Sequence, residues 1–485
     1  MSSNPVTRKT IISSLFWKAF ERIGKKGITF VISIILARLL APRDYGIVVL
    51  VMVFIDIAVI FIENGFSVAL VQKKNADDTD FSSVFFFSIA FSALTYIILW
   101  FAAPFIAGFY KLPEIKPVLR VLSAVIFLGT LNSIQHAILS RNMAFKKSFK
   151  IVISGVIISA FVGIWMAYAG YGVWALVGQK ITSYTCQNII MWYMVKWKPK
   201  LLFSGKRLRS LFSFGGRTFL ASLLHYVYND FCSLIIGKSF SSAALGIYNK
   251  GITFPQFIVS NLDGPIQSVM FPALASFQED KAKLKKMVRH AIVTSSFLVI
   301  PAMVGLAVVA RPLVIVLLTE KWLPCVFFLQ WACIKFAFWP LQSTNLQVLK
   351  AMGEGKILLR IEVAKKIIMI AGFCVAAFVF RSLEAVVIFD AFTTLISILI
   401  GALPNRKLIG YSLREQLADV IPFIGLSALM GLIIMSIRIP GLGYLPLMMV
   451  QAFAGIVVYF AMAWILRLEC LQYLINIVRK KGKKD

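Results

Sequence analysis

The residues of this chain that first suggest chemistry are three cations within the mostly apolar stretch 16–40. Lys18, Arg22 and Lys25 are separated by steps of four and three residues, which place them on one face of an α-helix. A row of cations favours an anionic ligand, and phosphate or pyrophosphate matches the donor geometry of arginine and lysine. The sequence therefore predicts an anion-binding helix near the N-terminus.

The surroundings of this helix leave two interpretations of its cationic face. The stretch is long enough to cross a bilayer, but a charged face turned toward lipid would cost several kcal/mol. The helix could instead lie on the membrane surface, with its cations among the head groups. Alternatively, it crosses the membrane, and its cationic face forms one wall of a water-filled cavity inside a helical bundle.

The composition indicates which class of protein must position these residues. Apolar residues make up 59% of the chain and charged residues 15%, and the mean hydropathy is +0.83. A soluble protein of this length, 485 residues, would carry about a quarter charged residues. The predicted fold class is therefore an all-α polytopic membrane protein, in which about fourteen apolar segments can be drawn as transmembrane helices.

The net charge of +30 would indicate nucleic-acid binding in a soluble protein, but its distribution here indicates a membrane orientation. Most of the 51 Lys and Arg fall in every second connection between apolar segments. By the positive-inside rule, those connections and both termini are expected to be cytoplasmic. The basic surface should attract anionic lipid of the inner leaflet, and no nucleic-acid partner is expected.

The second half of the chain resembles the first at a shift of 200 positions. The matching residues are Ser33, Ile35, Arg38, Gly46 and Ile47 in the first half, and Ser233, Ile235, Lys238, Gly246 and Ile247 in the second. Such a repeat predicts two duplicated six-helix lobes with a substrate held between them. The expected domains are the lobes 1–200 and 201–410, followed by two additional helices and a basic tail in 411–485.

Polar residues of the second half strengthen the cavity interpretation. The stretch 211–236 is the counterpart of the first apolar stretch, and it also carries a polar stripe with helical spacing. The repeat places the two stripes opposite each other, so we expect both to line a central cationic cavity. The substrate-binding candidates are Lys18, Arg22, Lys25, Lys180, Arg217, His225 and Lys335. The ion-coupling candidates, chosen for their depth in apolar segments, are Asp56, Glu63, Asp230 and Asp263, although each could equally be paired within the bundle.

The sequence carries no pattern of a catalytic or cofactor centre. Residues 353–356 lack the spacing of a phosphate-binding P-loop, and the three His and six Cys lack metal-ligand spacing. The acidic segment 78–80 resembles a sugar-nucleotide metal motif, but its place just before an apolar segment favours capping of that helix. No enzyme activity, cofactor or metal is therefore expected.

Five segments in order along the chain resemble a known transporter family. They are Ile35–Val48, Leu139–Lys147, Gly170–Gln179, Tyr248–Gln256 and Met270–Lys286. In these segments the chain is similar to the polysaccharide branch of the multidrug/oligosaccharidyl-lipid/polysaccharide (MOP) exporter superfamily. The resemblance is closest to Wzx-type flippases of the colanic acid and teichuronic acid kind.

This resemblance implies a MATE-like fold of two six-helix lobes around a central cationic cavity, often with two extra C-terminal helices. It implies transport of an undecaprenyl-pyrophosphate-linked oligosaccharide across the bacterial plasma membrane, from the cytoplasmic to the outer leaflet, for surface polysaccharide synthesis. By the same resemblance, Lys18, Arg22, Lys25 and Arg217 would line the cavity. The polysaccharide polymerase machinery is implied as a further partner.

Three other functions remain open from the sequence. A lipid II flippase would share the fold and the charge and differ only in its substrate. A drug or cation antiporter of the same superfamily would be expected to have an acidic cavity instead of a basic one. A membrane glycan polymerase would usually carry a large external loop, and the connections of this chain are too short for one.

Overall fold

The structure is a computed structural model that describes residues 8–60, 70, 73, 76–209, 226, 230–437, 439–468 and 470–472. These residues form α-helices, with one short 3-10 helix and one π-helical segment, and they contain no β-strand. The predicted all-α fold is confirmed. The chain groups into two compact units, Met1–Gly246 and Ile247–Asp485, and each unit is described by itself below.

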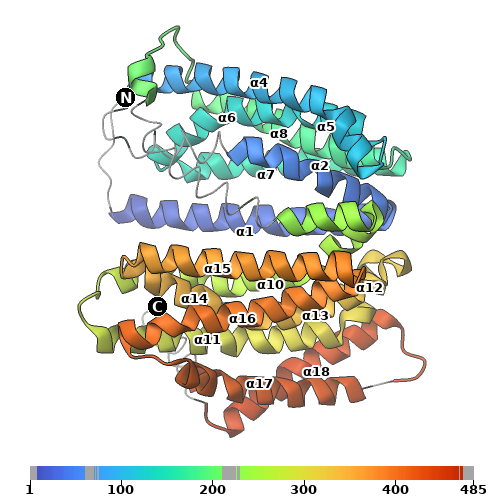
Figure 1. Cartoon of the computed structure of the whole chain (residues 1–485), viewed down its shortest axis with the longest axis vertical. Coiled ribbons are helices and arrows are strands. Elements are labelled where there is room, and N and C mark those ends of the chain that lie inside the picture. Colours follow the sequence, from blue (N-terminus) through green and yellow to red (C-terminus); the bar gives the residue numbers. More distant parts are fainter. Residues whose placement is uncertain are drawn as a thin grey trace. The chain divides into compact units, whose positions relative to one another are not determined.

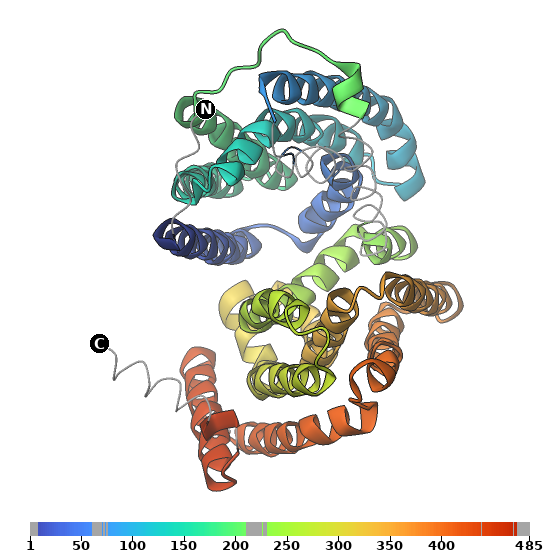
Figure 2. The same ribbon diagram turned by 90° about the vertical axis from the view of Figure 1, so that its left-hand side faces the viewer.

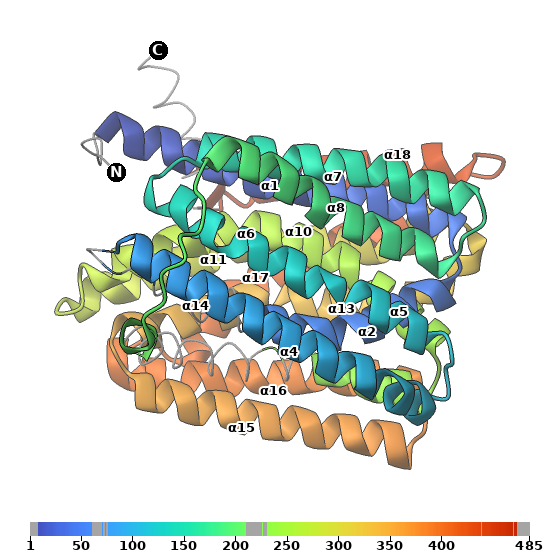
Figure 3. The same cartoon turned by 90° about the horizontal axis from the view of Figure 1, so that it is seen from above.

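In the first unit, long helices lie side by side (Figure 1). They are α1 (Arg8–Leu39), α2 (Pro42–Ile60), α4 (Asp78–Tyr110), α5 (Ile115–Leu122), α6 (Ala124–Arg141), α7 (Phe145–Tyr168) and α8 (Val173–Val195). Helix α7 packs along both α1 and α8, and α6 packs on α4 and α8 (Figure 3). Helix α1 is therefore joined along its length to the helices of this unit.

The second unit continues from α10 (Ser242–Ala275), whose first residues still belong to the first unit. The following helices are α11 (Lys281–Val308), α12 (Ala310–Leu318), α13 (Cys325–Ala337), α14 (Trp339–Ala351), α15 (Gly355–Cys374), α16 (Leu383–Ile409), α17 (Leu413–Ser436) and α18 (Tyr444–Ile465). Helices α17 and α18, in red tones in Figure 2, lie at the edge of this unit, where α17 packs on α11. The expected pair of additional C-terminal helices is present.

Several helices have the length and hydropathy of membrane spans. Within the described residues seven qualify, and α13 and α14 would make an eighth if this pair, bent by 42°, is one span. The seven are α4, Ile115–Arg141 (α5 with α6), α7, α11, α16, α17 and α18. The larger number of about fourteen spans stays a prediction.

The junction between α1 and α2 is short, although the Pro and Gly of residues 41–46 are typical of a longer turn. Helix α1 ends at Leu39 and α2 begins at Pro42, so residues 43–46 form the first turn of α2. Proline is suited to a first helical position because the N–H that it lacks would have no partner inside the helix. The side chain of Asp44 accepts a hydrogen bond from the Ala41 N–H at 3.1 Å and so stabilises this short junction.

Residues that the repeat pairs meet each other within the first unit. A Cβ atom on Gly46 would collide with the carbonyl group of Ser242, and one on Gly246 would collide with that of Pro42. The repeat aligns position 46 with 246 and position 42 with 242, so the contact is reciprocal. Glycine lets the first turns of α2 and α10 approach to backbone contact. This reciprocal contact supports the internal duplication.

The connection after α8, residues 196–209, crosses the start of α4 and is called the strap below. Trp197 is buried beside two phenylalanines of α4, with ring centroids 5.8 and 6.3 Å apart. The backbone N–H groups of Lys200 and Ser204 donate to the hydroxyls of Ser82 and Ser83 at 3.0 and 2.9 Å. These bonds fix an otherwise extended segment to α4.

Acidic residues at the start of α4 bind the strap and cap the helix. Asp77 and Asp80 form a reciprocal capping box, which confirms capping over a metal motif for this segment. Arg207 of the strap donates to both carboxylate oxygens of Asp77 at 2.5 Å. Hydrogen bonding by Arg207, and then by the Asp80 N–H, lowers the pKa of Asp77 to about 2. Lys73 pairs with Asp80 at 2.7 Å.

Candidate functional site

Helix α1 has two exposed faces, one cationic and one apolar. Lys18, Arg22 and Lys25 are exposed on the first face. The exposed apolar residues are Phe16, Phe20, Ile23 and Val31. At about 100° per residue, the two sets point to opposite sides of the helix. The apolar face suits lipid, so the cations need not face it.

The packing of α1 on α7 favours a membrane-crossing helix over one that lies on the surface. Lys18 Nζ lies 5.3 Å from the ring centroid of Phe145. One turn further along α7, the ring centroid of Phe149 lies 5.5 Å from that of Trp17. Gly24 then faces Ile153. The two helices therefore run in the same direction side by side, and α7 has the length and hydropathy of a span.

One carboxylate accompanies the three cations. Glu21 is only 9% exposed, and its Oε1 lies 3.3 Å from Lys18 Nζ. Its Oε2 accepts no hydrogen bond. Among the residues that the structure describes, Arg22 and Lys25 form no ion pair. The face thus keeps a net positive charge that a ligand can use.

Ionisable residues of α6 and α8 lie within electrostatic range of this face, and a residue of α2 interacts with the one on α8. His136 of α6 interacts with Lys18, Glu21 and Lys25. Lys180 of α8 interacts with Lys25 and with Asp56 of α2. We call this group the first-unit polar cluster; its members are Lys18, Glu21, Arg22, Lys25, Asp56, His136 and Lys180. The structure therefore brings four of the seven predicted substrate-binding residues together with one predicted coupling residue.

Sequence reasoning did not include His136 among the site residues, because it considered this histidine only as a metal ligand. A signal was nevertheless present beside it. Asn132, Gln135 and His136 share one face of α6 at helical spacing. Gln135 is fully buried with neither amide atom hydrogen-bonded, and Asn132 Oδ1 also lacks a partner. Such groups are costly to leave unpaired, by about 1–3 kcal/mol each, which points to a role beyond packing.

Lys335, the predicted binding residue of the second unit, is already paired. Its Nζ lies 2.7 Å from Asp390 Oδ2, which joins α13 to α16. The Asp390 side chain is 5% exposed, and that of Lys335 is 23% exposed. This geometry gives Lys335 a structural partner within the second unit.

The remaining predicted residues fall into two groups. Asp263 is buried in the second unit. Asp230 is half-buried in the first unit. Glu63, Arg217 and His225 lie outside the described residues.

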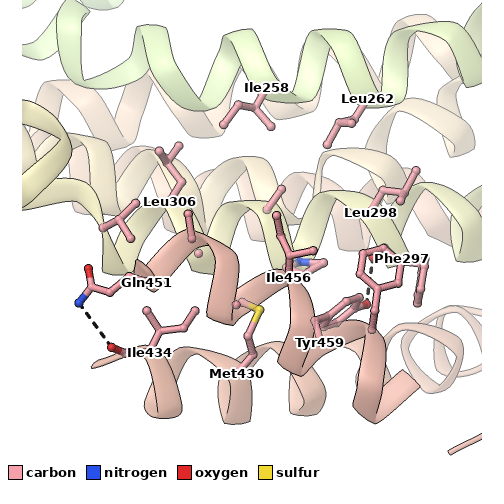
Figure 4. A pocket seen from close by; sticks show the side chains of 17 residues that line it. Ile258, Leu262, Phe297, Leu298, Leu306, Met430, Ile434, Gln451, Ile456 and Tyr459 are labelled. Carbon is pink, nitrogen blue, oxygen red and sulfur yellow. Dashed lines mark hydrogen bonds between the residues drawn. The ribbon is translucent and has the colours of Figure 1, made fainter. Parts of the chain in front are cut away.

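An apolar cavity of about 430 Å³ lies in the second unit, between α10, α11, α17 and α18 (Figure 4). Ile258 and Leu262 form one wall, and Met430 and Ile456 lie across from them. Its few polar groups are largely bonded to the protein: the Tyr459 hydroxyl donates to the Phe297 carbonyl at 2.9 Å. The cavity therefore suits an apolar chain.

The chemistry available at these sites is binding. In the part of the chain that the structure describes, no three His, Cys, Asp or Glu side chains are grouped to hold a metal ion. The first-unit polar cluster offers ammonium, guanidinium and imidazole groups, which bind anions. The second-unit cavity offers an apolar surface. Taken separately, the cluster fits an anionic group and the cavity fits an apolar chain.

Comparison with known proteins places these features in a family. Residues 35–327, more than half of the chain, match the family described as "Polysaccharide biosynthesis protein". The succinoglycan biosynthesis transport protein ExoT of Rhizobium meliloti is 22% identical, over 73% of this chain and 72% of ExoT. The teichuronic acid biosynthesis protein TuaB of Bacillus subtilis is 24% identical, over 62% of each chain. The alignment thus spans slightly less than two thirds of TuaB.

Solved structures share the fold at low sequence identity. The lipid II flippase MurJ, in an inward closed conformation, aligns with a TM-score of 0.77 and 16% identity, over 94% of this chain and 98% of MurJ. A multidrug resistance MATE family transporter of the MOP superfamily, in an inward-facing conformation, aligns with a TM-score of 0.63 and 15% identity. That alignment covers 82% of this chain and 98% of the transporter.

Proposed function

Because this chain belongs to the polysaccharide biosynthesis protein family, we propose that it flips an undecaprenyl-pyrophosphate-linked oligosaccharide from the cytoplasmic to the outer leaflet. The chain is a multi-pass membrane transporter of the MOP superfamily and not an enzyme. The resemblance to the polysaccharide branch of this superfamily is confirmed by the family match. The identity of the cargo is the part that we propose.

The observation that carries this proposal is the exposed cationic face of α1. Arg22 and Lys25 lie on the side of the helix opposite its apolar face, and the described residues offer them no ion-pair partner. A pyrophosphate group would supply the missing negative charge with oxygen atoms that arginine binds in pairs.

The apolar end of such a substrate also has a counterpart. A polyprenyl chain is long and apolar, and the cavity between α10 and α18 is lined almost entirely by apolar side chains. The cavity supports the proposal because a water-soluble cargo would not need it.

The charge of the head group favours export without ATP. A group with about two negative charges that moves out of an inside-negative cell gains about 2.3 kcal/mol per charge for each 100 mV. We propose alternating access between the duplicated lobes, 1–200 and 201–410, as the route. Arg217 and His225 would complete the cationic site from the second lobe.

Three alternative functions can be compared with these observations. A lipid II flippase would use the same cationic face, so only the substrate separates the two functions. A drug or cation antiporter would need an acidic site, and the exposed face of α1 is basic. A glycan polymerase is disfavoured because the similar protein ExoT is a transport protein.

We propose that the chain lies in the bacterial plasma membrane with both termini cytoplasmic. The strap would then lie at the inner surface, where it offers an anchor for anionic lipid. Leu201 is 95% exposed, and Leu202 and Phe203 are also exposed. The flanking cations Lys196, Lys198, Lys206 and Arg209 have no ion-pair partner among the described residues. Apolar side chains between cations favour insertion at an anionic interface.

A fluorophore at position 203 tests this anchor. In anionic vesicles, spin-labelled lipids should quench it more strongly than a fluorophore at Gly205, which faces open space. Equal quenching at both positions would contradict insertion. The polymerase machinery is proposed as a second partner, since it would consume the flipped unit.

Reconstitution in vesicles tests the function itself. The purified protein should expose a fluorescent undecaprenyl-pyrophosphate oligosaccharide to an external glycosidase faster than empty vesicles do. Lipid II should be exposed more slowly, and an organic cation should not be transported. Equal exposure in empty vesicles would refute the proposal, and faster exposure of lipid II would favour the first alternative. In cells, loss of the gene should leave the lipid-linked unit in the inner leaflet, whereas a polymerase defect would change polymer length.

A further inference from the structure

Two lysines flank the line of contact between α1 and α7, one on each side. Lys18 Nζ lies 5.3 Å from the ring centroid of Phe145, and Lys146 Nζ lies 5.4 Å from that of Trp17. Phe145 and Lys146 follow each other in α7, so their side chains point about 100° apart and take different sides of the contact. Lys18 belongs to the cationic face of α1, and Lys146 therefore lies on the side away from that face.

The apolar face of α1 lies on the same side of this contact as Lys146. Phe16 and Lys18 are the sequence neighbours of Trp17, so they point about 100° to either side of it. Because Lys18 takes the opposite side from Lys146, Phe16 takes the same side. The ring of Phe20 stacks on that of Phe16 at a centroid distance of 5.9 Å, and both side chains are exposed. Exposed aromatic rings thus lie beside a cation.

An exposed stripe of α7 continues this surface. Steps of four, seven and four residues place its members on one side of the helix: Lys146, Lys150, Ile157 and Phe161. The two lysines are one turn apart, with about 5–6 Å between their Cβ atoms, so both can reach one anionic group. The later members are apolar. We call this stripe, together with Phe16, Phe20 and Ile23 of α1, the α1/α7 seam.

The apolar face of α1 leaves room beyond its aromatic rings. Gly27 comes one turn after Ile23, and a Cβ atom at Gly27 would meet nothing within 4 Å. Ile23 is exposed, and so is Val31 one turn beyond the glycine. The surface between two apolar side chains is therefore lowered by one side chain. A flexible acyl chain can fill such a space.

The cations of the α1/α7 seam have no acidic partner. In the part of the chain that the structure describes, neither Lys146 nor Lys150 forms an ion pair. Helix α7 runs beside α1 in the same direction (Figure 3), so in the proposed orientation both helices begin at the cytoplasmic surface. The two lysines then lie at the level of lipid phosphates, and the apolar side chains lie at the level of the acyl chains. This order of charge and apolar surface matches a phospholipid with an anionic head.

We propose that the α1/α7 seam binds one anionic phospholipid, whose phosphate is held by Lys146 and Lys150 and whose acyl chains lie along the apolar face of α1. Only the leaflet, the inner one, depends on the proposed orientation. The transported lipid is a poorer occupant, because its pyrophosphate is attracted to the three cations on the other side of α1. The bound phospholipid would brace α1, since α7 is the described helix on which α1 packs most extensively.

Quenching of Trp17 fluorescence measures occupation of the seam, because Lys146 lies over its ring. The protein is placed in vesicles of phosphatidylcholine and phosphatidylglycerol, with bromine atoms on the acyl chains of one lipid or the other. The difference between the wild type and Trp17→Phe isolates the signal of this residue. At equal mole fraction, brominated phosphatidylglycerol should quench it more strongly than brominated phosphatidylcholine. Equal quenching by the two lipids would refute an anionic site.

Substitution of the lysines tests which side of the contact holds the lipid. A lysine near the membrane surface contributes about fivefold to the affinity for anionic lipid, so Lys146→Ala and Lys150→Ala should each lower the preference for phosphatidylglycerol by about that factor. Lys18→Ala is the matched control, because it removes a cation next to the same ring contact but on the other side. An equal loss in Lys18→Ala would refute the seam and indicate a general attraction of the basic surface.

Undecaprenyl pyrophosphate distinguishes the phospholipid from the cargo. Added without label at the mole fraction of phosphatidylglycerol, it should leave the quenching of Trp17 unchanged. If it relieves the quenching more effectively than unlabelled phosphatidylglycerol does, the seam holds the transported lipid and the phospholipid site is refuted. Thermal unfolding gives a second readout: phosphatidylglycerol should raise the midpoint of the wild type more than that of the double variant Lys146→Ala and Lys150→Ala. An equal rise in both proteins would contradict the bracing of α1.

Discussion

In the first unit, Lys18, Arg22 and Lys25 lie exposed along α1, whereas in the second unit Lys335 is held 2.7 Å from Asp390 between α13 and α16. The repeat implies that the two halves of the sequence share an origin, yet the cations of the two units have different surroundings. The three exposed cations share one nearby carboxylate, that of Glu21, which pairs with Lys18. The buried cation has a partner of its own.

This difference separates cations that can bind a ligand from cations that hold the bundle together. A buried ion pair that loses one member leaves an uncompensated charge, whereas an exposed cation can be removed with little effect on folding. Variants of the two kinds should therefore have opposite signatures. The second-unit pair should control stability, and the first-unit cations should control transport.

The largest expected effect is on stability, from Lys335→Ala. This variant strands Asp390, and breaking such a buried pair costs about 3–5 kcal/mol. The midpoint of thermal unfolding in detergent should fall sharply. The double variant Lys335→Met with Asp390→Leu should recover most of the loss, because an apolar pair needs no counter-charge. A Lys335→Ala protein of wild-type stability that fails to bind pyrophosphate would place Lys335 with the ligand-binding cations instead.

A smaller loss of stability is expected at the close contact between α2 and α10, where matching residues of the repeat meet. Gly246→Ala would force a Cβ into the carbonyl of Pro42, and overpacking of this kind costs about 1–3 kcal/mol. Gly27→Ala is the matched control, because a Cβ there meets nothing within 4 Å and alanine favours the helix. The midpoint temperature of thermal unfolding should therefore fall in Gly246→Ala and should not fall in Gly27→Ala. Equal stability of both variants would contradict the close approach of α2 and α10.

Sequence reasoning predicted those parts of the fold that depend on composition and periodicity. Hydropathy was sufficient for the all-α membrane class, and spacing was sufficient to place Lys18, Arg22 and Lys25 on one face. The shift of 200 positions aligns Gly46 with Gly246, the two glycines that lie at the close contact of α2 and α10. Each of these inferences needs only local order along the chain.

Inferences that depend on distant partners could not be made from spacing. Nothing near Lys335 in sequence announces Asp390, which is 55 residues away. His136 looked like an isolated interior residue because its neighbours in the cluster come from α1. The junction at residues 41–46 contains Pro and Gly, which are typical of a turn, but proline also begins helices, and here it does.

A modest effect on affinity would sharpen the comparison within the first-unit polar cluster. Among the described residues, Glu21 is the carboxylate that pairs with the α1 cations, so Glu21→Gln frees Lys18. Such a pair is worth up to about 1 kcal/mol, so the affinity for inorganic pyrophosphate should rise by up to about fivefold. Isothermal titration of the purified protein measures it. Weaker binding would mean that Glu21 orients the cations rather than competes for them.

The smallest expected effect is on hydrogen exchange in the strap, where Arg207 pairs with Asp77 at the surface. The pKa of Asp77 is lowered from 3.8 to about 2, so its stabilising contribution is complete at neutral pH and is lost as the pH falls through that range. At neutral pH, Asp77→Asn should speed hydrogen exchange at Lys200 and Ser204 slightly. Glu279→Gln, an exposed acid without an ion pair in the described structure, should leave it unchanged. Equal exchange in both variants would show that the backbone bonds alone hold the strap.

The most direct test of the central claim is the flipping rate of the double variant Arg22→Ala and Lys25→Ala in vesicles. The account predicts a folded protein with wild-type thermal stability, because both side chains are exposed, and a flipping rate at least about tenfold lower. The charge-retaining double variant Arg22→Lys and Lys25→Arg should keep most of the rate. Wild-type flipping by the alanine variant would contradict the claim that the cationic face of α1 carries the anionic head of the substrate.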